Sequence, residues 1–179
     1  MEFTSQRLIF RLYEQGDMDF LYSMLSDSQM MKYIGNGNKR NREESHAFLE
    51  RIQSHYKKNG EYGLKLLIRK KDGVPVGHAG IIPQQIGGED ELEIGYWIAK
   101  EFWGNGYAIE AASALLNRGV EQLGLTRLIS LIQPENTRSI RIANKNGMHL
   151  EKEVILKGKE VSVYTYKKSN DVERKRGNV

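Results

Sequence analysis

The sequence predicts an α+β domain, in which a mixed, mostly antiparallel sheet of about seven strands is flanked by about four helices. Two observations lead to this prediction. The hydrophobic period alternates between that of strands and that of helices in the order β-α-α-β-β-β-α-β-α-β-β. Turn-forming segments between the apolar runs predict antiparallel hairpins on both sides of one right-handed β-α-β crossover.

The first half of the chain is predicted to hold one strand and two helices, over residues 7–13, 16–27 and 41–60. The first helix begins near Asp17, a good capping residue. Asn41 and Glu44 form a capping-box pattern at the start of the second helix, and Gly60 ends it. A loop rich in glycine and asparagine, residues 30–40, connects the two helices.

The second half changes to the two-residue period of strands and holds the predicted crossover. The expected elements are strands at 62–70, 74–84, 91–100 and 125–133, helices at about 104–120 and 136–147, and a final hairpin over 148–168 that turns at Lys157–Lys159. The turn segments Lys71–Gly73 and Gly87–Asp90 separate three of these strands. The polar residues 169–179 have the composition of a C-terminal tail, so we expect one domain over residues 1–168.

Composition places the protein among ordinary globular domains. Of 179 residues, 28% are charged and 39% hydrophobic, and the net charge is +4. The chain has no cysteine, which excludes disulfides, thiolate metal sites and a thiol nucleophile; we expect no metal. The first residues are too polar for a signal peptide, and no apolar run approaches the roughly 18 residues of a membrane span. We therefore expect a cytoplasmic protein.

The segment Trp103–Ala108, "WGNGYA", raises the question of why two glycines precede a helix. A nucleoside-triphosphatase loop would need a following Lys-Ser or Lys-Thr pair, which is missing. A dinucleotide fingerprint would need a third glycine at position 109, where this chain has Ile109. It would also need an acidic residue about 20 positions further on, and residues 126–133 contain none. Two interpretations stay open: an ordinary strand-to-helix turn, and a pyrophosphate cradle built from backbone N–H groups at the helix N-terminus.

Two linked motifs resemble the GNAT superfamily of acyl-CoA-dependent N-acetyltransferases, in particular its ribosomal-protein N-terminal acetyltransferase-like branch. The first motif is Gly104, Gly106 and Ala108 within "ELEIGYWIAKEFWGNGYAIEA". The second is Asn136 and Ser139, followed by Gly147, within "LISLIQPENTRSIRIANKNGM". The resemblance covers residues 7 to 167, and it implies direct transfer of an acetyl group from acetyl-CoA to an amine, with CoA as product.

The resemblance also implies a GNAT fold with a central splay between the strand ending near Ile98 and the strand at 127–132. The pantetheine arm would bind the backbone near Trp97 and Ile98 in this gap. The pyrophosphate would bind the N–H groups of residues 104–108, which are Gly104, Asn105, Gly106, Tyr107 and Ala108. Asn136 and Ser139 would complete the cofactor site. A side chain at 104 or 106 would block the approach of the pyrophosphate.

The chemistry requires a base, an oxyanion donor and a donor to the departing thiolate. An α-amine has a pKa of about 8 and a lysine of about 10.4, so the acceptor must lose a proton. We expect Glu93 to be the base, through a water, with Glu91 and His78 as alternatives. A free backbone N–H at a strand bulge near Ile98 is the expected oxyanion donor.

For the thiolate, many members of the family carry a tyrosine four residues before the last glycine, where this chain has Ala143. We expect Ser139 to take that place, and Asn136 to bind the pantetheine amide or cap its helix. Two interpretations stay open for the basic residues of this helix: they reach the CoA phosphates, or they form a solvated helix face. These residues are Arg138, Arg141 and Lys145.

The acceptor side is expected to come from the two N-terminal helices and their loop. Tyr33, Tyr56 and Trp97 are possible walls, and the glycines at 35–37 suggest a lid. A ribosomal-protein N-terminus, a free amino acid, a polyamine and an aminoglycoside all remain open as acceptors. Two rivals are a non-catalytic acyl-CoA sensor and a nucleic-acid binder, although dispersed basic residues argue against the latter. We expect no nucleic-acid or membrane partner and a possible homodimer.

Overall fold

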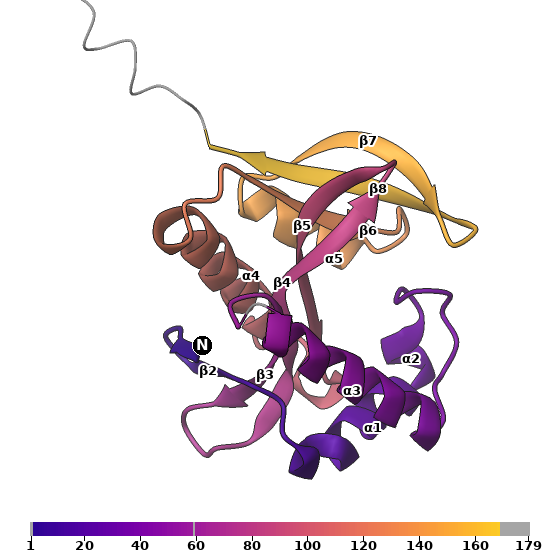
Figure 1. The fold of residues 1–179 in the computed structure, drawn as a ribbon, viewed down its shortest axis with the longest axis vertical. Coiled ribbons are helices and arrows are strands. Elements are labelled where there is room, and N and C mark those ends of the chain that lie inside the picture. The colour runs from indigo at the N-terminus through magenta and orange to yellow at the C-terminus, as the bar shows by residue number, and fades with distance from the viewer. Residues whose placement is uncertain (1, 59, 169–179) are drawn as a thin grey trace, which may run out of the picture.

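The computed structural model describes residues 2–58 and 60–168, so the predicted tail at 169–179 lies outside the described residues. The described residues form one sheet of eight strands in the order β1-β2-β3-β4-β5-β6-β8-β7 (Figure 1). The strands are β1 Phe3–Thr4, β2 Leu8–Arg11, β3 Gly63–Arg69, β4 Pro75–Ile86, β5 Glu89–Ile98, β6 Arg127–Ile132, β7 His149–Leu156 and β8 Lys159–Lys167. All neighbouring pairs are antiparallel except β5 and β6. The predicted mixed sheet with one parallel pair is therefore confirmed.

Five α-helices accompany this sheet in the described ranges: α1 Met18–Ser26, α2 Ser28–Met31, α3 Arg42–Lys58, α4 Tyr107–Asn117 and α5 Thr137–Lys145. The short η1 Gln15–Asp17 precedes α1 directly, the π-helical η3 Arg118–Gln122 continues α4, and η2 Lys100–Phe102 is a separate turn after β5. β1 and α2 were not predicted, because two and four residues are too few to show a period. No helix in the described ranges is long and apolar enough to cross a membrane.

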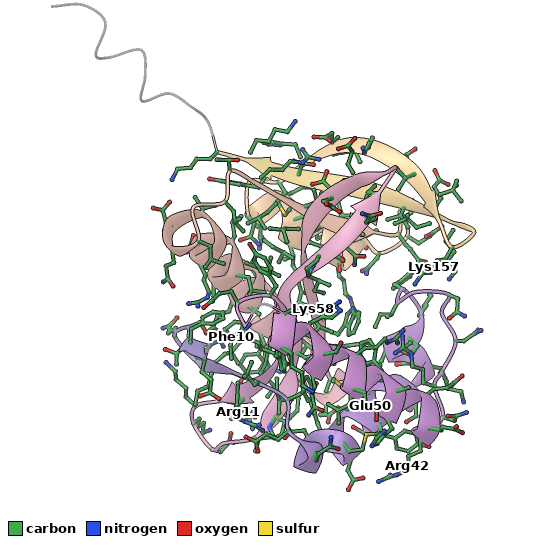
Figure 2. The ribbon with its side chains drawn as sticks, in the orientation of Figure 1. Phe10, Arg11, Arg42, Glu50, Lys58 and Lys157 are labelled. Atoms are coloured by element: carbon green, nitrogen blue, oxygen red, sulfur yellow. The ribbon has the colours of Figure 1, made fainter. Side chains whose placement is uncertain are left out.

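The two faces of the sheet bury different side chains because successive residues of a strand point to opposite sides. Leu67, Ala79, Ile94 and other residues pack against α4 in one core. Leu64 and Leu66 pack on the other face against α1 and α3, in a second core. Phe10 on β2 is fully buried, whereas its neighbour Arg11 is only half-buried (Figure 2). The sheet thus separates a layer of α1–α3 from a layer containing α4, as Figure 1 shows.

Candidate active site

A gap in the middle of the sheet separates β5 from β6. Among the described residues, these parallel strands share one pair in register, Glu93 with Ile129, and then diverge toward their C-terminal ends. Substitutes replace the lost ladder bonds at this point: Ser130 Oγ donates to the Ile94 carbonyl at 3.1 Å, and the Leu131 N–H donates to the Glu93 carboxylate. We call this point, formed by Glu93, Ser130 and Leu131, the vertex of the gap. The expected splay is present.

Backbone groups of β5 face this gap at every second residue. The Ala99 N–H donates to the Val76 carbonyl at 2.9 Å, so alternation along the antiparallel β4–β5 ladder turns Ile94, Tyr96 and Ile98 toward β6. The Ile98 carbonyl accepts from the Trp103 indole at 2.6 Å. The N–H groups of Tyr96 and Ile98 are thus directed into the gap.

This ladder corrects two details of the sequence interpretation. The β4–β5 register runs from Gly77–Ile98 to Ile86–Glu89 without a shift, so the expected bulge near Ile98 is absent. The Ile98 N–H faces the gap because of regular alternation, not because of an extra residue. The Trp97 backbone faces β4 for the same reason, and the groups open toward the gap belong to its two neighbours.

Glu93 lies at the vertex with a desolvated carboxylate. Its Oε2 accepts from Gln84 Nε2 at 2.6 Å. Burial raises the pKa of Glu93 to about 7, although the hydrogen bonds from Gln84 and the Leu131 N–H oppose this shift. A carboxylate with such a pKa can accept a proton near neutral pH, which an ordinary glutamate does poorly.

The two alternative bases are both engaged elsewhere. Glu91 accepts from Arg127 at 2.6 Å, and the same guanidinium also pairs with Glu151 at 2.8 Å. His78 is fully buried, and its Nδ1 lies 2.8 Å from the Tyr13 hydroxyl. Burial lowers the pKa of His78 to about 3, so its imidazole is neutral. Of the three candidate bases, Glu93 is therefore the one that lies at the vertex.

The turn before α4 combines an unusual backbone with open space above it. Gly104 and Gly106 both have φ of +79°, in the left-handed region that side chains avoid. A Cβ added to Gly104 would meet no protein atom within 4 Å, so a ligand can approach there. Helix α4 therefore begins at Tyr107, later than the predicted position near 104. Its first N–H groups are available to an anion.

Other side chains hold this turn in shape. Asn105 Nδ2 donates to the Phe102 and Trp103 carbonyls at 3.0 and 3.1 Å. Arg7 on the segment before β2 donates to the Asn105 carbonyl at 3.0 Å and pairs with Glu110 at 2.6 Å. Tyr107 is buried, so it offers its backbone rather than its ring. The turn presents backbone donors while its side chains brace it from below.

The start of α5 lies opposite this turn. The Asn136 side chain caps the helix by accepting from the Ser139 N–H at 3.3 Å, which confirms its expected capping role. The Tyr96 hydroxyl, on β5, donates to the Ser139 carbonyl at 3.4 Å and so spans the gap. Arg138 lies 5.2 Å from the Trp103 ring centroid. We call the Gly104–Ala108 turn together with Asn136 and Ser139 the mouth of the gap.

The side of the sheet that carries α1–α3 forms the opposite approach to Glu93. Trp97 shares the Glu93 face of β5 and lies against His78, with ring centroids 4.4 Å apart. Tyr33 lines an open cleft of about 380 Å³ together with Lys32, Gln133, Glu135, Lys159 and Glu160. Tyr56 instead donates to the Leu64 carbonyl of β3, and its ring packs against the second core.

Sequence reasoning missed Gln84, Ser130 and Tyr96 in this site. Ser130 had a readable signal, because it is a lone hydroxyl inside the apolar run "LISLI". Tyr96 looked like an ordinary core residue of its strand, and its ring does pack against the core beneath α4. Gln84 could not be assigned, because only the β4–β5 register places it opposite Glu91 and beside Glu93.

Comparison with known proteins identifies the family. Residues 7–149 match the family model described as the acetyltransferase (GNAT) domain. The chain belongs to the GNAT acetyltransferase family. This membership identifies it as an acetyl-CoA-dependent acetyltransferase.

Two relatives from Bacillus subtilis (strain 168) cover nearly the whole chain. YkkB is 36% identical over 173 residues, which are 95% of this chain and 91% of that protein. YnaD, named as an N-acetyltransferase, is 36% identical over 165 residues, with 89% and 91% covered. The similarity therefore extends over both the glycine turn and the acceptor-side helices.

Solved structures agree with this assignment. A GNAT-family acetyltransferase from Bacillus anthracis is 29% identical, with a TM-score of 0.78 over 93% of this chain and 98% of that one. RimL, a ribosomal L7/L12 α-N-protein acetyltransferase solved with coenzyme A, has a TM-score of 0.77 over 93% and 98% but only 17% identity. The latter likeness shows the fold alone.

Proposed function

We propose that this GNAT acetyltransferase moves the acetyl group of acetyl-CoA directly to a primary amine, within a ternary complex of enzyme, cosubstrate and acceptor. The observation that carries the proposal is Glu93, a desolvated carboxylate with a pKa of about 7 at the vertex of a gap lined with backbone N–H groups. The name of the relative YnaD, an N-acetyltransferase, supports an amine as acceptor.

Acetyl-CoA fits the gap on two grounds. The Tyr96 and Ile98 N–H groups face a space where β6 has moved away, as an amide-bearing arm requires. The left-handed turn at Gly104 and Gly106, open above Gly104, offers the N–H groups of α4 to a pyrophosphate. Trp97 then serves the acceptor side, while Asn105, Tyr107 and Ala108 contribute through the backbone.

Glu93 would take the proton of the acceptor amine, directly or through a water. The freed nitrogen pair can then attack the thioester carbonyl, whose oxygen becomes negatively charged. The Ile98 N–H, or that of Tyr96, is placed to donate to this oxyanion because it points into the gap. The bond from carbon to sulfur breaks as the amide forms.

Ser139 would donate a hydrogen bond to the departing thiolate. It lies in the first turn of α5, and its carbonyl accepts a hydrogen bond from the Tyr96 hydroxyl across the gap. Ala143, at the position of the usual family tyrosine, is buried at 2% exposure and cannot donate through its side chain. Tyr96 is the second hydroxyl at this place; burial raises its pKa to about 12, so it stays protonated.

Calorimetric titration with acetyl-CoA, followed by amines, tests the proposal. Tight binding of acetyl-CoA and turnover of one amine class are expected. Binding without turnover of any amine or N-terminal peptide would support the rival, a non-catalytic acyl-CoA sensor. Absence of acetyl-CoA binding would contradict the proposed function itself.

A further inference from the structure

An aromatic patch lies beside the acceptor approach, on the Glu93 face of the sheet. It consists of Phe48 from α3, His78 from β4 and Trp97 from β5. The Phe48 ring centroid lies 6.1 Å from that of Trp97 and 6.4 Å from that of His78. Trp97 and Glu93 flank Gly95 on one face of β5, and the Ile82 side chain lies over Gly95 between the patch and the candidate base.

Two guanidinium groups lie over the same Phe48 ring. Arg40 approaches its centroid to 4.3 Å and Arg51 to 5.4 Å. Neither forms an ion pair with a described residue, unlike Arg7, Arg11 and Arg127. Burial and the repulsion of Arg51 lower the pKa of Arg40, while the weaker attraction of Glu44 opposes that shift. The patch therefore concentrates positive charge without a partner in this part of the chain.

Two buried polar atoms, one in this patch and one in a guanidinium over it, have no hydrogen-bond partner among the described residues. They are Nη1 of Arg40 and Nε2 of His78. An unsatisfied buried donor of a charged group is costly, and native proteins rarely retain one without a reason. The neutral His78 ring cannot supply the missing negative charge. Arg40 thus presents a desolvated, forked donor that an anionic ligand group would satisfy.

We propose that Arg40, assisted by Arg51, binds a carboxylate carried by the acceptor amine. This inference rests on the proposed function and names the chemistry of its acceptor. The amine lies at Glu93, and the body of the acceptor crosses the Ile82 side chain, which covers Gly95, toward Trp97. Its carboxylate reaches the Arg40 guanidinium, whose planar fork matches two carboxylate oxygens. Polyamines and aminoglycosides are disfavoured, because they would place a second cation beside two guanidinium groups.

Paired acceptors that differ only in one carboxylate test this inference. One pair is a long-chain ω-amino acid and its amide, since Glu93 and Trp97 are about 13 Å apart along the strand; the other is a C-terminally amidated peptide with glutamate or glutamine at its second residue. We expect the carboxylate member of at least one pair to be preferred roughly tenfold to a hundredfold in kcat/KM, as for a charge-assisted hydrogen bond. The pair that responds tells whether the carboxylate comes from a free amino acid or from a peptide.

Arg40→Gln should abolish that preference by raising KM for the carboxylate acceptor, with unchanged affinity for acetyl-CoA. Arg40→Lys should restore part of it, because an ammonium keeps the charge but lacks the fork. The matched control is Arg42→Gln, since Arg42 is exposed at the start of α3 (Figure 2) and pairs with Asp19 at 2.6 Å. This control should keep the preference intact.

Equal rates for both members of both pairs would overturn the inference. So would an Arg40→Gln variant that loses activity equally with acid and amide, because Arg40 would then only support the fold or hold a water. Both results leave acetyl-CoA binding and amine acetylation in place. If the protein binds no acetyl-CoA, the proposed function fails instead, and this inference falls with it.

Discussion

The vertex and the mouth of the gap are built on different principles. At the vertex, side chains replace the backbone hydrogen bonds that β5 and β6 lose as they diverge. Ser130 donates to the Ile94 carbonyl, and Glu93 accepts from the Leu131 N–H. At the mouth, the glycine turn directs its side chains into the protein or lacks them, and it offers N–H groups of the backbone. The vertex therefore depends on residue chemistry, whereas the mouth depends on backbone conformation.

This difference predicts a separation of effects. Substitutions at the vertex should change the rate of the chemical step and its pH dependence while leaving cosubstrate affinity intact. Substitutions in the Gly104–Ala108 turn of the mouth should change cosubstrate affinity first, whereas Ser139, next to the thiolate, should affect the chemical step. Variants that affected both quantities equally would contradict the division.

The largest expected effect is that of Glu93→Gln. Loss of the base should lower kcat by about 10²- to 10⁴-fold, with little change in the Kd of acetyl-CoA measured by calorimetry. Glu91→Gln is the matched control, because Glu91 lies on the same face of β5 but is paired with Arg127. Its turnover should stay near that of the unmodified protein. A small effect of Glu93→Gln would assign the base role to water or another group.

At the mouth, Gly104→Val should weaken acetyl-CoA binding roughly a hundredfold or more, by strain at φ +79° and by filling the open space at the anion site. Gly124→Val is the control: Gly124 has φ of +67° and no atom within 4 Å of an added Cβ, and it follows η3 rather than the turn before α4. Both variants should lose about 1–2 kcal/mol of stability. Equal affinity of the two variants for acetyl-CoA would argue against the cradle.

The pH dependence of activity and of stability should both reflect Glu93. kcat/KM should rise with pH and level off above an apparent pKa near 7, because the base must be deprotonated. Burial raises this pKa from the ordinary glutamate value of 4.5, so folding free energy is lost as pH rises from about 4.5 to about 7 and is level above that. Glu93→Gln should remove this cost and be relatively more stable at pH 8, by on the order of 2 kcal/mol in urea unfolding. A pH-independent stability difference would contradict the raised pKa of Glu93.

The smallest effect is expected for Ser139→Ala. Loss of a hydrogen bond to the thiolate should lower kcat roughly tenfold, and most strongly for acceptors whose reaction is limited by thiolate departure. Thr137→Ala, two residues earlier in the same turn and exposed, should have no effect. An unchanged rate for Ser139→Ala, with a slow Tyr96→Phe variant, would transfer the donor role to Tyr96.

The order of elements and the glycine turn could be predicted from the sequence alone, because both depend on local rules. Hydrophobic periods identified the main strands and helices, and only β1 and α2 were too short to show one. Gly104 and Gly106 marked the turn because few other residues adopt its left-handed backbone. The motifs around Gly104, Asn136 and Ser139 pointed to the family, which the family model confirms.

Only the tertiary structure separated residues of the same chemical kind. Glu91 and Glu93 stand two positions apart on one strand face, yet one reaches Arg127 and the other is desolvated at the vertex. Likewise His78 is neutralised by burial, and Arg40 lies unpaired over Phe48 although its neighbours in sequence suggest a solvated loop. Ion pairing and desolvation arise from residues distant in sequence, so no local pattern encodes them. The sequence determined which backbone could cradle a ligand, and the fold decided which side chains can do chemistry there.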